Sequence, residues 1–73
     1  MHEISFELYK SLKQRYEADI QECKSTLLIY FESSIGIADH SNILDEMDGL
    51  MSRISEANDK LNILKETFTV YKL

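Results

Sequence analysis

The sequence predicts an all-α protein built as a hairpin of two antiparallel α-helices. The 73 residues include no proline and only two glycines, Gly36 and Gly49. On both sides of Gly36, apolar residues recur at intervals of three and four, which is typical of amphipathic helices with a coiled-coil-like seam. The connection between the two segments is short, so the helices are expected to lie side by side and antiparallel.

The first helix is expected at about residues 3–33. Lysine, glutamine and glutamate side chains fill the positions between its apolar residues, as on a helix face turned to water. Its apolar stripe consists of Tyr9, Leu12, Tyr16, Ile20, Cys23, Leu27 and Tyr30.

A turn is expected at about residues 34–39. Gly36 is expected to close the first helix in a left-handed conformation, which costs least for a residue without a Cβ atom. Asp39 or Ser41 is expected to cap the second helix, because either side chain accepts a hydrogen bond from an unpaired backbone N–H.

The second helix is expected at about residues 40–68, followed by a tail at 69–73 that frays or bends because it is rich in β-branched residues. Glu56 and Lys60 form an i, i+4 pair in the favourable order. The acids at 45, 46 and 48 suit the positive end of the helix dipole. The apolar stripe consists of Met47, Leu50 or Met51, Ile54, Ala57, Leu61, Leu64 and Phe68.

More apolar residues are present than two helices can bury against each other. The additional ones are Phe6, Leu8, Leu28, Ile29, Phe31, Ile43, Leu44 and Ile63. A chain this short has little core of its own. The sequence therefore predicts a homo-oligomer, with a dimer that forms a four-helix bundle favoured.

Charge is distributed unevenly along the predicted hairpin, and this favours a head-to-tail dimer. Lysines 10, 13, 60, 65 and 72 fall toward the open end, and acids 32, 39, 45, 46 and 48 toward the turn. An antiparallel arrangement of two hairpins places each acidic end beside a basic one. Such exposed pairs are individually weak, so the apolar stripes remain the main force for association.

Composition excludes several classes of partner. The formal net charge is −5 and residues 26–59 carry one base and seven acids, so no basic stripe for phosphate contacts is expected and nucleic acid is not a predicted ligand. No apolar run approaches the ~20 residues that span a bilayer. The single Cys23 allows no intrachain disulfide, and the start of the chain lacks the pattern of a signal peptide. A cytoplasmic protein is therefore expected.

No catalytic, cofactor-binding or metal-ligating residue is predicted, so a non-enzymatic protein is expected. His40 stands beside Asp39, but neither a Glu-x-x-His pair nor Cys/His ligand spacing accompanies it, so a turn role is favoured over a functional one. Three carboxylates at 45–48 are typical of a helix start rather than of a calcium loop. Cys23 is expected to be buried on the seam. Gly49 has two interpretations, a neutral position or a site of close backbone approach.

Residues 34–48 and 54–61 carry a resemblance to small uncharacterised helical proteins of large tailed bacteriophages, notably marine ones. The matching features are a glycine-containing turn, an acidic-His step, an Ile/Leu-x-Glu-Met-Asp helix start and a closing Glu-Ala-Asn-Asp-Lys-Leu. With upstream positions, the resemblance covers about residues 8–68. Ser41 stands where those proteins often have proline. We expect a helical adaptor or structural protein that contacts itself and a host or viral protein, in the host cytoplasm or in the virion. The resemblance suggests a viral origin and implies nothing about mechanism. It implies no catalytic residue.

Ser41-Asn42-Ile43-Leu44-Asp45 resembles the Ser-x-x-Leu-Asp motif of the sporulation aspartyl-phosphate phosphatases, which are also helical hairpins. Those proteins carry the motif further into their second helix, and that helix is shorter. This resemblance implies the alternative function, a small regulatory enzyme acting on an acyl phosphate. A shifted carboxylate or a metal near the turn would favour the enzyme, and a large apolar face would favour the adaptor.

Overall fold

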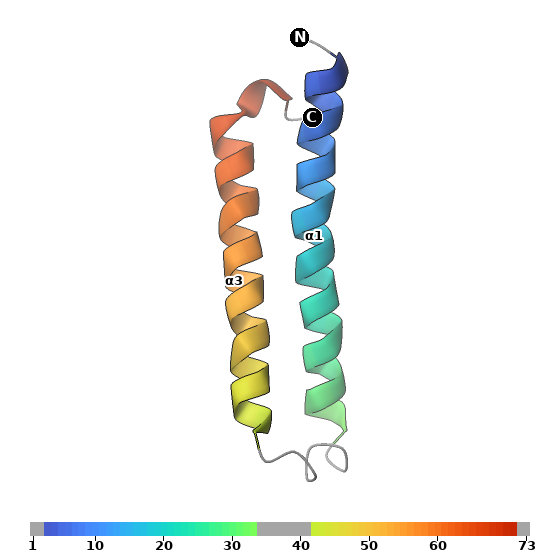
Figure 1. Cartoon of the computed structure of the whole chain (residues 1–73), viewed down its shortest axis with the longest axis vertical. Coiled ribbons are helices and arrows are strands. Elements are labelled where there is room, and N and C mark those ends of the chain that lie inside the picture. Colours follow the sequence, from blue (N-terminus) through green and yellow to red (C-terminus); the bar gives the residue numbers. More distant parts are fainter. Residues whose placement is uncertain (1–2, 34–41, 72–73) are drawn as a thin grey trace.

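The structure is a computed structural model that describes residues 3–33 and 42–71. Two long helices, α1 (Glu3–Glu32) and α3 (Ile43–Thr67), run antiparallel and pack against each other (Figure 1). A short 3-10 helix, η1 (Thr69–Tyr71), follows α3. The described ranges contain no strand. The predicted two-helix, all-α fold is therefore confirmed.

The helices begin and end close to the predicted positions. α1 ends at Glu32, where the Ser33 amide donates to the Ile29 carbonyl at 2.9 Å. α3 begins at Ile43, about three residues later than predicted, and its N-cap is Asn42, whose side chain makes no capping hydrogen bond. The residues expected to shape the turn and the cap, 36, 39, 40 and 41, lie outside the described residues.

The chain bends after α3 and crosses the open end of the hairpin (Figure 1). The Phe68 amide donates to the Leu64 carbonyl at 3.1 Å, and the Tyr71 amide donates to the Phe68 carbonyl at 3.1 Å. The Tyr71 ring packs on Tyr9 with ring centroids 5.7 Å apart. The bend was predicted, but residues 69–71 are not frayed, because an aromatic contact with α1 orders them.

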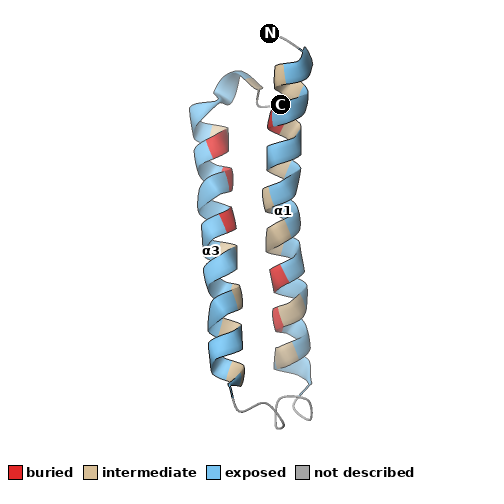
Figure 2. Cartoon of the chain, viewed as in Figure 1, coloured by how far each residue is buried: buried red, intermediate tan, exposed pale blue. Residues whose placement is uncertain are grey.

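The buried residues lie on the sides of α1 and α3 that face each other (Figure 2). The sequence offered Leu50 or Met51 for one position of the second stripe. Leu50 is half-buried whereas Met51 is 54 % exposed, so Leu50 occupies that position. Leu12 and Phe68, at 38 % and 48 % exposed, lie at the margin of this buried region. The buried residues, all predicted members of the two stripes, are Tyr9, Cys23, Leu27, Ala57, Leu61 and Leu64.

Side-chain contacts across the hairpin fix the register of the two helices. From the turn toward the open end, the paired residues are Tyr30 with Glu46, Glu22 with Arg53, and Tyr16 with Lys60. Steps of six to eight residues along α1 are thus matched by steps of seven along α3. Each step is about two helical turns, so the same face of each helix meets the other along the rod, which measures 53 × 15 × 15 Å.

Candidate functional site

An apolar groove, which we call the open-end groove, lies between the two helices near the chain ends. Three adjoining hollows of about 150, 240 and 380 Å³ all have Leu12 in their linings. The two smaller hollows are lined by both helices, and the largest extends the groove along α1 alone. The groove is lined mainly by Leu8, Leu12, Tyr16, Ile63, Leu64 and Phe68.

Helical spacing and side-chain size produce this groove. Leu8 and Leu12 are one turn apart on α1, and Ile63 lies one residue outside the buried Leu64 on α3. Leu8 is 63 % exposed and Ile63 is 61 % exposed, so both present apolar surface to water. A contiguous apolar surface of this kind on a small protein is typical of a contact site for another protein.

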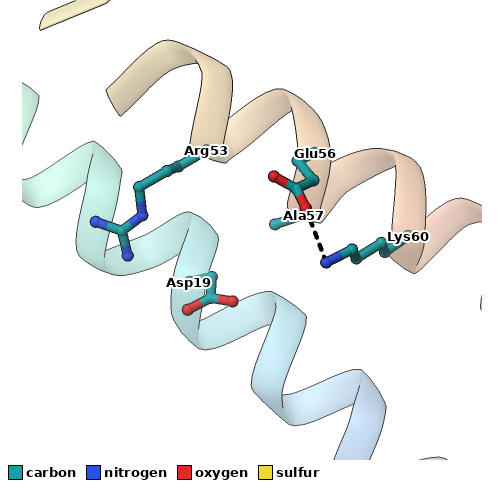
Figure 3. A pocket seen from close by; sticks show the side chains of 5 residues that line it. All are labelled: Asp19, Arg53, Glu56, Ala57 and Lys60. Atoms are coloured by element: carbon teal, nitrogen blue, oxygen red, sulfur yellow. Dashed lines mark ion pairs between the residues drawn. The ribbon is translucent and has the colours of Figure 1, made fainter. Parts of the chain in front are cut away.

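A charged cluster borders the groove at the middle of the rod. A shallow pocket of about 110 Å³ is lined by Asp19 from α1 and by four residues of α3. Figure 3 shows Arg53 reaching from α3 toward α1, with Asp19 on the facing helix. Ala57, which is only 4 % exposed, has the smallest side chain in the lining of this pocket.

Ion pairs organise this cluster. Lys60 Nζ lies 3.0 Å from Glu56 Oε1 (Figure 3), which confirms the pair predicted from the sequence. The hydrogen bond to Glu56 raises the pKa of Lys60 above its usual value. Arg53 Nη2 lies 3.9 Å from Glu22 Oε2, a looser contact that connects the helices. All four side chains are at least half exposed, so each pair contributes little stability, and the cluster mainly fixes where charge is presented.

The groove and the cluster lie on the same side of the hairpin, which we call the grooved face. Lys60 belongs to both, because it lines the charged pocket and one of the apolar hollows, and its Nζ lies 5.9 Å from the centre of the Tyr16 ring. On α3, positions 53, 56, 60 and 63 follow the three-and-four spacing of one helix face. Apolar surface at the open end is thus continuous with charged surface at mid-length.

A polar contact joins the helices beside the turn. The Tyr30 hydroxyl donates a hydrogen bond to Glu46 Oε2 at 3.0 Å. This hydrogen bond raises the pKa of Tyr30 above 10.0. Asp45, Glu46 and Asp48 are exposed in the first turns of α3, where the helix dipole favours them.

The structure also places the individual residues that the sequence singled out. Cys23 is completely buried, as predicted. A Cβ atom added at Gly49 would meet nothing within 4 Å, so no described backbone of the same hairpin approaches it closely. His40 lies outside the described residues. Among residues 3–33 and 42–71, no group of three or more His, Cys, Asp or Glu side chains is arranged to hold a metal ion.

Sequence reasoning missed the contact between Arg53 and Glu22 and the position of Asp19 in the charged cluster. Their signal was their place beside the apolar stripes, where charged residues commonly pair between packed helices. A second exposed apolar group, three of whose members were among the additional apolar residues that predicted association, lies in the half of the rod near the turn. It consists of Leu28, Phe31, Leu44 and Met51.

Within the described part of the chain, neither helix has the length and apolar character that crossing a membrane requires. Compared with known proteins, the chain matches no family model, and no curated protein or solved structure matches it either.

Proposed function

We propose that this chain is a non-enzymatic, phage-encoded helical adaptor or structural protein that acts through protein–protein contacts. Its hairpins associate in pairs to form a four-helix bundle. The observation that carries the proposal is the balance of apolar side chains: six are buried in the described chain, and eleven large ones are exposed. A hairpin with more apolar surface outside than inside is suited to binding another protein.

The surface area of the hairpin supports association. The chain exposes 5670 Å². A compact folded chain of the same 8.5 kDa would expose about 4,700 Å². The excess is close to the roughly 800 Å² that each partner buries in an interface of standard size. The radius of gyration of 16.3 Å, against about 11 Å for a compact chain of this length, shows that the excess comes from the elongated shape.

An adaptor also needs surface for a different partner. Leu28, Phe31, Leu44 and Met51 are each more than half exposed near the turn, away from the open-end groove. We assign this group to a host or viral protein, and the resemblance of residues 34–48 and 54–61 to phage proteins supports that setting, in the host cytoplasm or in the virion. The exposed aromatic and methionine side chains are of the types enriched at protein interfaces.

Self-association is tested by light scattering across micromolar concentrations. We expect a mass of twice the chain's 8.5 kDa and an unfolding temperature that rises with concentration, because a dimer is stabilised by mass action. Ile63→Glu places a charge in the open-end groove and should shift the protein toward monomer. Asn62→Glu, its matched control, adds the same charge on the adjacent exposed position and should leave the mass unchanged.

A folded monomer at all concentrations would overturn the proposal. Equal effects of Ile63→Glu and Asn62→Glu would show that net charge, rather than the groove, controls association.

A further inference from the structure

One row of residues on α1 has a pattern that is complementary to itself when reversed. Leu8, Arg15, Glu22 and Ile29 are each seven residues apart, so they lie along one side of the helix. Leu8 lines the open-end groove and Glu22 contacts Arg53, which places the row at the edge of the grooved face. Read from either end, the row has an apolar residue, two opposite charges and an apolar residue.

We propose that a second copy of the chain docks on this row, with α1 antiparallel to α1 of the partner copy. In that register Leu8 faces Ile29 of the other copy, and Arg15 faces Glu22 of the other copy. The two-fold axis repeats both contacts on its other side. The two Leu8–Ile29 contacts pair apolar side chains, and the two Arg15–Glu22 contacts pair opposite charges. The inference rests on the proposed self-association and adds the face, the direction and the register.

The exposure of the four residues supports this register. Leu8 is 63 % exposed and Ile29 is 65 % exposed. Ile29 would enter the hollow of about 380 Å³ beside Leu8 and Leu12. Arg15 lines the same hollow, and no ion pair within the described residues involves it. The carboxylate of Glu22 is 69 % exposed and only loosely held by Arg53 at 3.9 Å, so it is accessible to a second guanidinium.

Other arrangements fit the charges less well. The equivalent row on the opposite edge of α1 is Lys10, Glu17, Lys24 and Phe31, and its reversal sets a lysine against a phenylalanine at each end. Within one chain, Tyr16 and Lys60 lie at the same height along the rod. Hairpins packed in the same direction would therefore place Arg15 at the height of Lys60 of the other copy, so that two positive charges would meet. That packing would also set the exposed acids at the start of both α3 helices side by side.

A charge exchange tests the pairing. Arg15→Glu and Glu22→Arg should each raise the dimer dissociation constant by roughly tenfold, since each turns two attractive contacts into two repulsive ones. The double variant should return it close to the wild-type value. Gln14→Glu, which adds a negative charge one residue away from the row, serves as the matched control and should have little effect. Circular dichroism of every variant reports whether the hairpin remains folded.

Cross-linking tests the register directly. Leu8→Cys and Ile29→Cys are 21 residues apart, about 31 Å along one helix, so a disulfide between these positions can form only between copies. A mixture of the two single variants should oxidise quickly to a covalent dimer, and each variant alone should do so slowly. Wild-type protein, whose Cys23 is completely buried, should give no covalent dimer.

The outcomes separate the two proposals. A monomeric wild-type protein would overturn both. A dimer in which the double variant stays weak, or in which the mixture cross-links no faster than each variant alone, would leave self-association standing and overturn the antiparallel α1 pairing. Stronger association of Arg15→Glu would indicate hairpins packed in the same direction, with the new carboxylate beside Lys60 of the other copy.

Discussion

The Tyr30 hydroxyl and the Glu46 carboxylate are joined by a 3.0 Å hydrogen bond that connects the last turn of α1 to the first turn of α3. Sixteen residues separate them in the sequence. The contact therefore joins the two helices directly beside the connecting segment. It lies at an exposed position, where few buried apolar side chains hold the helices together.

Tyr30→Phe should change how stability depends on alkaline pH. The hydrogen bond raises the pKa of Tyr30 in the folded state above 10.0, so its contribution is present below pH 10 and is lost as the pH rises through the folded-state pKa. We expect wild type to lose more stability than Tyr30→Phe between neutral pH and that pKa, measured by urea unfolding. Lys60, whose pKa is also raised, is present in both proteins and cancels in the comparison. Parallel pH profiles for the two proteins would contradict the expectation.

Leu27→Asp should unfold the hairpin, and Leu28→Asp should not. Leu27 is 7 % exposed, and an unpaired charge at such a position costs several kcal/mol, against a total of ~5–15 kcal/mol for a typical domain. Leu28, the adjacent residue, is 54 % exposed. Circular dichroism should show loss of helix only in the first variant, and similar spectra for both would mean that the seam is on another face.

Gly49→Ala should stabilise the protein by about 1 kcal/mol, because alanine is the better helix former and its Cβ would meet no neighbour within 4 Å. Ser52→Ala, on an exposed position of the same helix, should give a smaller rise. Both are measured by thermal unfolding. A loss of stability in Gly49→Ala would reveal a neighbour at this position that the single hairpin lacks.

The Cys23 thiol should react with an aromatic disulfide reagent only when the helices separate, because the side chain is 0 % exposed. Its reaction rate should rise steeply with urea, and denatured protein should react at once. Ser25→Cys in a Cys23→Ala background places a thiol at an exposed position and should react quickly in the folded protein. Equal rates for the two folded proteins would show that Cys23 is accessible.

Tyr71→Ala should destabilise the hairpin by about 0.5–1.5 kcal/mol through loss of the ring contact with Tyr9. Val70→Ala, at a position that is 65 % exposed, should have a much smaller effect. Denaturant midpoints of the two variants provide the comparison. No difference between them would mean that η1 contributes nothing to closing the open end.

The helices and their buried stripe could be predicted because a repeating apolar interval depends only on local sequence. All six buried residues, from Tyr9 to Leu64, were in the predicted stripes. The contact of Arg53 with Glu22 could not be predicted, since shifting one helix by seven residues would leave both stripes facing each other. The fold of residues 69–71 was missed for a related reason. Their local preference is weak, and Tyr9, which holds Tyr71, lies at the other end of the chain.

Steps of six to eight residues on α1 match steps of seven on α3, so the hairpin can change in length without a change in how its helices pack. A block of two turns can be removed from both helices at the same level, and every remaining contact keeps its partner. Removal from one helix alone would move Tyr30 from Glu46 or Tyr16 from Lys60. Chains of this design are therefore free to lengthen or shorten over time, provided that insertions and deletions occur in pairs.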